Sequence, residues 1–368
     1  MYLDPDIKHV DIEDTFGLTR SGVDSRAQSL KLGRVTRSRN PKQIPPETTD
    51  ESVHTQTVYQ PIEVKPLTII KRERTEEEQV LELSDIHAGR WTTSYDISVL
   101  KQRLNNLLKS VASIGQLHQN LYPLRTLNIF GLGDWVQNER VEVVPWDEVQ
   151  KTVEEQIFDV LIPELSTFLV SLLQIYPNIK LHCVRGNHGK VAKLRSPRTN
   201  WDQVTYKALA LALSEFDRIS FDIETERFYK LVEIQGRKFL LIHGDQINMY
   251  NSIPWYGLVT RGLRWHTSIE ANTDDMLAVL SRLLEGKISK EEAGKLLVTF
   301  PYEAVALGHF HNCCDMDFNT IRFLMNGCFV SDDEYVLHKL GMKGSTSQLT
   351  FGVHPKGITW SYKLDLTR

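Results

Sequence analysis

Hydrophobic and polar residues follow regular patterns from about residue 77 onward. Short apolar runs such as Val80–Leu83 and Leu127–Leu132 are typical of buried strands, whereas the Ile and Leu spacing of Ser94–Val111 predicts an amphipathic helix. The same criteria give strands at 179–184, 229–234, 238–243, 304–307, 321–325, 348–353 and 358–364, and helices at 146–175, 201–216 and within 274–297. We expect Gln235-Gly236 to form a hairpin turn and Pro163 to bend the longest helix.

The order of these elements predicts the fold class. Strands and helices alternate through most of the regular region, and its last third is mostly strands. Such an order is typical of layered α/β domains, in which helices cover the outer faces of packed sheets. We therefore expect residues 76–368 to form an α-β-β-α sandwich of two mixed sheets flanked by helices.

Residues 1–75 lack this periodicity, and we expect them to form an irregular, flexible or docking N-terminal segment. Seven Lys and Arg residues lie between Arg20 and Lys42, against a single Asp. The alternative is therefore a basic arm for nucleic acid or an acidic partner.

Composition excludes several classes of protein. The 43 Lys and Arg against 47 Asp and Glu exclude a globally basic nucleic-acid coat, although not a local basic patch. Four Cys residues in 368 cannot form a disulfide scaffold, which favours a reducing compartment. The start of the chain has no secretory pattern, and no apolar run is long enough to span a bilayer. We expect a cytoplasmic protein without a membrane partner.

Five polar clusters each follow an apolar strand, and they begin about 50 to 65 residues apart. Ligands of α/β folds bind beyond the carboxyl ends of the strands, so we expect the five loops to converge at one edge. Each cluster alone is typical of a turn or a helix cap, but their order and spacing together favour a shared site. The clusters are Ser84–His87, Gly131–Asp134, Arg185–His188, Ile242–Asp245 and Gly308–His311.

These clusters would bring together two carboxylates, one amide oxygen and four imidazoles, with no thiolate. That donor set suits manganese, iron or zinc better than calcium. Seven ligands exceed the need of one ion, and with one carboxylate shared they form two sites of four ligands each. Asp-X-His and His-X-His spacing in extended chain also directs both side chains of each pair to the same side. The candidate ligands are Asp85, His87, Asp134, Asn187, His243, His309 and His311.

The ordered motifs Asp85-X-His87, Gly133-Asp134, Gly186-Asn187-His188, His243-Gly244 and Gly308-His309-Phe310-His311 resemble the signature of the calcineurin-like metallophosphoesterase superfamily. The resemblance covers about residues 80–364. The first and last motifs are similar to those of DNA-repair exonuclease subunits. The Arg185–His188 loop is similar to that of serine/threonine protein phosphatases. The chain as a whole resembles uncharacterised members that bacteriophages encode.

This resemblance implies a role for each residue. Asp85, His87 and His311 would hold one metal, Asn187, His243 and His309 would hold the other, and Asp134 would bridge them. A hydroxide between the metals would attack phosphorus, and His188 would protonate the leaving oxygen. Arg185 is a candidate to hold a phosphate oxygen with its planar fork, with a surface salt bridge as the alternative. Lys190 is a weaker candidate of the same kind.

Two positions depart from the protein-phosphatase pattern. That group has a second Asp after the bridging one, whereas this chain has Trp135–Asn138, and Gly189 replaces the acid that often follows Gly-Asn-His. The usual orienting partner of His188 is therefore missing or comes from elsewhere. Asp245 is a candidate to support a ligand histidine, with a turn-forming role as the alternative.

Other polar and aromatic residues have two interpretations each. Asn200 or Asp202 would cap the helix that follows, and Trp201 would pack in the core or stack on a base. The aromatic residues of the irregular stretch after the fourth cluster would pack in the core or form a wall over the metals. Adjacent Cys313 and Cys314 are expected to be packing residues. The aromatic residues are Tyr250, Trp255, Tyr256 and Trp265.

The sequence therefore predicts a two-metal phosphoester hydrolase with manganese first among the candidate metals. Within that class, the nuclease-like motifs favour a phosphodiesterase or nuclease acting on DNA or nucleotides, with an ATPase or a replication or repair protein as a conceivable partner. One alternative is a phosphomonoesterase, either for nucleotides or for serine/threonine phosphoproteins. A second is a non-catalytic scaffold that retains the fold.

Overall fold

The computed structural model describes residues 76–138, 148–192, 198–249, 254–268, 280–292, 302–318, 321–332 and 344–368. The expected N-terminal segment 1–75, with its basic arm, lies outside this part of the chain.

Two mixed sheets form the centre of the fold. The first has the order β11-β10-β1-β2-β3-β4, in which β1 to β4 are parallel and β10 and β11 run antiparallel to their neighbours. Its strands are β1 (Glu77–Leu83), β2 (Leu124–Gly131), β3 (Asn178–Cys183), β4 (Ile219–Ile223), β10 (Ser347–His354) and β11 (Gly357–Asp365). The second has the order β5-β6-β7-β9-β8. Its strands are β5 (Tyr229–Ile234), β6 (Arg237–Ile242), β7 (Ala304–Leu307), β8 (Cys314–Phe318) and β9 (Ile321–Met325).

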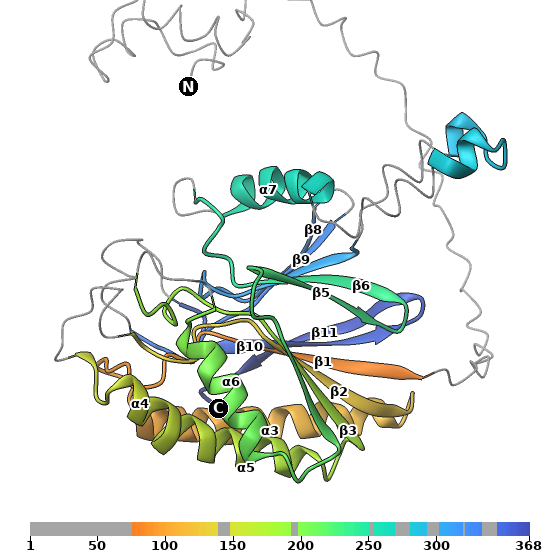
Figure 1. Cartoon of the computed structure of the whole chain (residues 1–368). Helices are drawn as coiled ribbons and strands as arrows, with labels where there is room; N and C mark the ends of the chain where they lie inside the picture. Colours follow the sequence, from red (N-terminus) through yellow and green to blue (C-terminus); the bar gives the residue numbers. More distant parts are fainter. Residues whose placement is uncertain are drawn as a thin grey trace, which may run out of the picture. The chain divides into compact units, whose positions relative to one another are not determined.

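Helices cover the outer face of each sheet (Figure 1). Three helical segments lie beside the six-stranded sheet: α3 (Ile97–Gln119), a continuous segment and α6 (Trp201–Ala212). The continuous segment consists of α4 (Val153–Glu155), η2 (Gln156–Leu161) and α5 (Ile162–Leu172). Helix α7 (Trp255–Ser268) packs against the five-stranded sheet through Leu258 and Trp265. Asp96 caps α3, because its side chain accepts a hydrogen bond from the N–H of Val99.

The alternation of side chains along each strand produces separate cores. On β1, Leu81 and Leu83 pack under the helices, whereas Val80 faces the space between the sheets. On β6, Leu241 joins the core between the sheets and Leu240 packs toward α7. This arrangement confirms the predicted α-β-β-α sandwich of two mixed sheets.

Some elements differ from the sequence-based expectation. Strands β4 and β8 were not expected, and the aromatic stretch expected to be irregular contains α7. The predicted helix 146–175 begins at Val153 and has a π-helical turn, η2, just before Pro163, which lies in the first turn of α5. Of the helical region expected within 274–297, residues 274–279 and 293–297 lie outside the described chain.

Candidate metal centre

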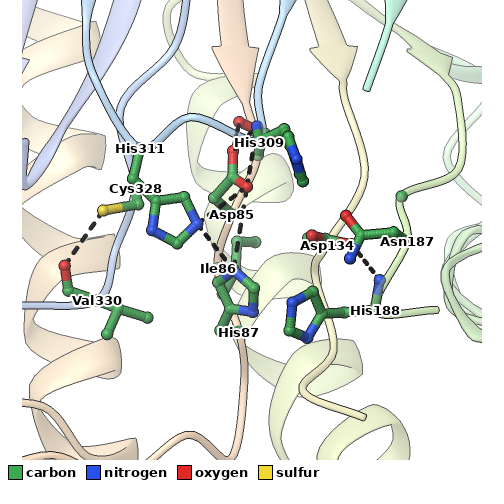
Figure 2. Close-up of polar contacts among 12 residues, drawn as sticks. Asp85, Ile86, His87, Asp134, Asn187, His188, His309, His311, Cys328 and Val330 are labelled. Carbon is green, nitrogen blue, oxygen red and sulfur yellow. Dashed lines mark hydrogen bonds and ion pairs between the residues drawn. The ribbon is translucent and has the colours of Figure 1, made fainter. Parts of the chain in front are cut away.

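All five polar clusters lie at the carboxyl ends of strands. The loops after β1, β2 and β3 carry Asp85, Asp134 and Asn187, and the loops after β6 and β7 carry His243 and His309. Because each set of strands is parallel within its sheet, all five loops emerge at one edge, as expected. Figure 2 shows Asp85, Asp134, Asn187 and His309 around a common centre.

One group of ligand atoms comes from Asp85, His87 and His311, and these atoms lie within 4.8 Å of one another. The Nε2 atoms of His87 and His311 are 3.2 Å apart, and His311 Nε2 is 3.4 Å from Asp85 Oδ1. The Asp85 carboxylate also accepts hydrogen bonds from the Ser84 hydroxyl at 2.5 Å and from the His309 N–H at 3.1 Å. Asp85 is therefore held by both sheets.

A second group comes from Asp134, His243 and His309, again within 4.8 Å. His243 Nε2 lies 3.0 Å from Asp134 Oδ2 and 2.9 Å from Asn187 Oδ1. Asp134 also forms a group with His87 and His188, so its carboxylate lies between the two sets of ligands. The structure thus brings all seven predicted ligands to one site.

The backbone at these ligands is unusual. Seven non-glycine residues of the described chain have positive φ, and five of them are candidate ligands. Left-handed backbone costs an L-residue about 1–2 kcal/mol and occurs more often at functional sites than elsewhere. The expectation that the Asp-X-His and His-X-His pairs converge through extended backbone is therefore wrong, because left-handed residues turn the side chains inward instead. The five ligands are Asp85 (52°), His87 (48°), Asp134 (55°), His309 (70°) and His311 (55°).

The loops approach so closely that side chains would not fit at certain glycines. A Cβ atom on Gly186 would lie 2.1 Å from Asp134 Oδ1, and one on Gly308 would lie 2.5 Å from Asp85 Oδ2. Glycine at these two positions thus allows the backbone of one loop to contact the carboxylate of another.

Hydrogen bonds fix the orientation of two imidazoles. His87 Nδ1 donates to Gln137 Oε1 at 2.9 Å, and His243 Nδ1 donates to the Leu132 carbonyl at 2.7 Å. In both rings this leaves Nε2 directed into the site, as is typical of metal-ligating histidines. Carboxylate and amide oxygens, together with imidazoles held in this orientation, are suitable ligands for divalent metal ions.

Electrostatic attraction couples Asp134 to His243. Burial opposes both charges, but the mutual attraction of the two groups prevails. It holds the pKa of Asp134 well below its usual range and raises the pKa of His243 to about 10. The Asp134 carboxylate thus stabilises a positive charge beside it, as it would stabilise a bound cation.

The candidate catalytic residues occupy different surroundings. The backbone N–H of His188 donates to Asp134 Oδ1 at 2.7 Å, and its ring packs edge-on against that of His87 at 4.6 Å. Arg185 Nη1 donates to the carbonyls of Arg227 at 2.8 Å and Glu226 at 3.3 Å. Arg185 therefore braces the chain between β4 and β5, and its contact with phosphate stays a prediction.

Lys190 and Asp245 join two of the loops. Lys190 Nζ lies 2.9 Å from Asp245 Oδ2, and both residues lie two positions beyond a histidine of the site. Asp245 was a candidate to support a ligand histidine, but the Nδ1 partner of His243 is the Leu132 carbonyl instead. The pair is a partly exposed salt bridge at the rim.

The remaining candidates have mostly structural surroundings. Asn200 is the N-cap of α6, and Trp201 packs against the core under the helices. Trp265 is buried, whereas Tyr256 is 76% exposed on α7. Cys313 packs in the core between the sheets and Cys314 in the core near α7, as expected of packing residues.

Three residues near the ligands were missed or misread from the sequence. Gln137 orients His87, and Asp202 is buried beneath the loops rather than capping its helix. Burial raises the pKa of Asp202 to about 6, with a further contribution from the negative charge of Asp134. Cys328 lies beside His311 and donates to the Val330 carbonyl at 3.2 Å (Figure 2). Gln137 and Cys328 follow strands β2 and β9, as the ligands follow their strands, and this position in the sequence could have identified them as residues near the site.

In the part of the chain that the structure describes, no helix combines the length and apolarity needed to cross a membrane.

The comparison with protein families agrees with this site. The family model described as calcineurin-like phosphoesterase matches residues 79–313. No curated protein matches the chain.

Among solved structures, Yfce, a phosphoesterase from E. coli, is 12% identical, and the match covers 78% of this chain and 100% of that one, with a TM-score of 0.32. A predicted phosphoesterase from Streptococcus pneumoniae is 10% identical over 78% and 98% of the two chains, with a TM-score of 0.29. Vps29 complexed with zinc, from Entamoeba histolytica, is 10% identical over 78% and 99%, with a TM-score of 0.30.

The family model spans well over half of the chain and includes every loop of the site from Asp85 to His311. This chain therefore belongs to the calcineurin-like phosphoesterase family, and it is a metal-dependent phosphoester hydrolase.

Proposed function

We propose that this protein is a two-metal phosphodiesterase that acts on DNA or nucleotides. The observation that carries the proposal is the place of Asp134. Its carboxylate lies within 4.8 Å of ligand atoms of His87 and His188 in one group and of His243 and His309 in another. A carboxylate placed between two sets of ligands can serve as a ligand of both cations in a two-metal site.

In this proposal the seven ligands divide between two metal sites. The first comprises Asp85, His87 and His311, the second comprises Asn187, His243 and His309, and Asp134 belongs to both. When bound, two divalent cations supply Lewis acidity at the phosphoryl group and lower the pKa of a water molecule. Manganese is our first choice, with iron or zinc as alternatives, because the donors are imidazoles and oxygens.

The residues of the chain position and protonate the substrate. His188 is half-buried, and the bond from its N–H to Asp134 holds it at the rim of the site. Its imidazole is the candidate to donate a proton to the leaving oxygen, which typically contributes 10²–10⁴-fold to the rate. Gln137 and the Leu132 carbonyl keep the rings of His87 and His243 in the metal-binding tautomer.

The charges around the site support a diester over a monoester. A phosphomonoester carries close to two negative charges and a diester one, so a monoesterase benefits from additional free cations. Here Lys190 is paired with Asp245, and the Arg185 guanidinium donates to backbone carbonyls. Independently of charge, Gln137 and Asn138 stand where the protein phosphatases have a second Asp, which weakens the resemblance to that class of monoesterase.

A phosphomonoesterase is the second candidate, because the Arg185–His188 loop resembles that of serine/threonine phosphatases. The nuclease-like motifs alone support DNA as the substrate. They alone also support an ATPase or a replication or repair protein as a partner.

The test is a manganese-dependent hydrolysis screen on the purified protein. Matched assays with bis-(p-nitrophenyl) phosphate and p-nitrophenyl phosphate distinguish a diesterase from a monoesterase. Single- and double-stranded DNA, RNA, cyclic nucleotides and phosphopeptides then define the substrate class. We expect cleavage of the diester and of DNA or a nucleotide, abolished by EDTA. Cleavage of the monoester alone would refute the diesterase, and inactivity with two bound metals would favour the scaffold.

A further inference from the structure

Asp202 lies in the first turn of α6, but its side chain does not cap that helix. The cap is Asn200, whose Oδ1 accepts the N–H of Asp202 at 2.8 Å. Asp202 itself is fully buried. Burying a carboxylate costs free energy unless it is hydrogen-bonded, so the hydrogen-bond partners of Asp202 indicate the role of an acid at this position.

The partners of the Asp202 carboxylate are three backbone N–H groups. Oδ2 accepts from Asp134 at 3.1 Å and from Gly186 at 2.8 Å, and Oδ1 accepts from Trp135 at 3.0 Å. Asp134 and Trp135 belong to the loop after β2, whereas Gly186 belongs to the loop after β3. One side chain therefore ties together two loops that are more than fifty residues apart.

These loops carry the central ligands of the site. Asp134 is the carboxylate between the two ligand groups, and Gly186 directly precedes Asn187. Asp134 has left-handed backbone with φ of 55°, a conformation that persists only when its surroundings hold it. The N–H of Asp134 donates to the Asp202 carboxylate, so this hydrogen bond acts at the strained residue itself.

We propose that Asp202 is a positioning residue, which sets the Asp134 carboxylate and the Asn187 amide at the spacing that two metals require. The proposal rests on the two-metal site of the proposed function, but not on the substrate. Asp202 acts through the backbone of both loops and touches neither metal nor substrate. A carboxylate suits this place because it offers two acceptor oxygens and no donor.

The decisive variant is Asp202→Asn, which keeps the shape of the side chain. An amide has one oxygen, so when that oxygen keeps the bonds to Asp134 and Gly186, the NH₂ group faces the N–H of Trp135. Asp222→Asn is the matched control, because Asp222 is an exposed acid on β4 that pairs with Lys230 at 2.7 Å. Both variants remove one carboxylate, but only the first loosens the loops.

Two measurements distinguish positioning from a general loss of stability. In metal-free protein, hydrogen exchange of the amides of Asp134, Trp135 and Gly186 should accelerate in Asp202→Asn and not in Asp222→Asn, while helix amides stay protected. In titrations with Mn²⁺, Asp202→Asn should bind about 10–100-fold more weakly and lose the spin-coupled signal of a manganese pair. Excess Mn²⁺ should restore much of the turnover, since no catalytic group is removed.

Unchanged exchange and unchanged Mn²⁺ affinity in Asp202→Asn would overturn the proposal. If that variant does not fold, hydrogen exchange in the wild type provides the test. Rapid exchange of the three amides in the intact protein would contradict their hydrogen bonds to Asp202 and overturn the proposal. A wild type that binds two coupled manganese ions but hydrolyses no phosphoester refutes the proposed function and leaves Asp202 to its own test. A wild type that binds no Mn²⁺ refutes the role of Asp202 in metal spacing.

Discussion

His188 is attached to the site through its backbone. Its backbone N–H donates to Asp134 Oδ1, so the position of the ring follows the position of the loop. In His188→Ala that backbone bond can persist, and we expect both metals to bind nearly normally while turnover falls by about 10²–10⁴-fold. Metal analysis and turnover of bis-(p-nitrophenyl) phosphate measure the two effects separately.

His182→Ala serves as the control for His188. His182 lies on β3 and contacts Asp222 and Asn128 within the sheet, so its loss should leave turnover unchanged. Parallel losses of metal and turnover in His188→Ala would instead make His188 a ligand.

Asp134 is expected to behave differently because its carboxylate lies between the two ligand groups. Asp134→Asn removes one anionic oxygen from both sites, so we expect both metals to bind at least 10–100-fold more weakly. Asp85→Asn is the comparison, since Asp85 groups with His87 and His311 alone. Titrations that count bound Mn²⁺ should show two weakened sites for Asp134→Asn and one for Asp85→Asn. An identical pattern in both variants would contradict a shared carboxylate.

At the scale of elements, Gly308 follows β7 and lets this loop approach the loop after β1. A Cβ atom there would lie 2.5 Å from Asp85 Oδ2 and 2.7 Å from Ser84 Oγ. In Gly308→Ala the loops must separate, which weakens the bond from the His309 N–H to Asp85. We expect a loss of stability of about 1–3 kcal/mol, as for other overpacked sites, and weaker binding of one metal.

Thermal unfolding and Mn²⁺ titration test Gly308→Ala. Gly236→Ala is the control, because Gly236 lies in the β5–β6 hairpin turn with open space around it and φ of 74°. That variant should lower stability through backbone strain but leave metal affinity intact. Normal metal affinity in Gly308→Ala would show that the loops can adjust.

The elements that the sequence predicted and those that it did not differ in the strength of their patterns. The strands Val80–Leu83 and Leu127–Leu132 are buried on both faces and are nearly continuous apolar runs, which makes them easy to recognise. Strand β4 is an edge strand with charged and half-exposed residues, and α7 is rich in aromatic residues that also occur in loops. Their local sequence therefore does not distinguish them from irregular chain.

The same distinction applies to the candidate site. The ligands were identifiable because they stand directly after strands in a set order, whereas Asp202 stands in a helix and acts through backbone groups. Its role depends on where α6 packs relative to two loops, which no local motif records. The left-handed backbone of the ligands was likewise invisible, since Asp and His adopt many conformations.

At the scale of the whole molecule, the space between the two sheets contains a buried acid. Glu82 lies two residues after Val80 on β1, so its side chain also faces that space. Within the described structure neither carboxylate oxygen has a hydrogen-bond partner. Burial, with a contribution from the negative charge of Asp315, raises the pKa of Glu82 well above its usual value.

The raised pKa predicts how the free energy of unfolding depends on pH. The native state binds the proton of Glu82 more tightly than the unfolded state does, so the contribution of Glu82 is greatest below the unfolded pKa of 4.5. It is lost as the pH rises toward the native pKa, by about 1.4 kcal/mol for each pH unit. Glu82→Gln cannot ionise, and we therefore expect its stability relative to the wild type to increase between pH 5 and pH 8.

Denaturant unfolding at both pH values, in EDTA so that metal binding does not vary, measures this change. Any fixed cost of burying the amide cancels, because only the difference between the two pH values is compared. The control is Glu233→Gln on β5, the same substitution at an exposed residue that leaves Glu82 in place. A Glu82→Gln variant whose stability follows that of the wild type across this range would mean that the buried acid is already ionised, since only an ionised Glu82 would leave the native and unfolded states with equal numbers of bound protons.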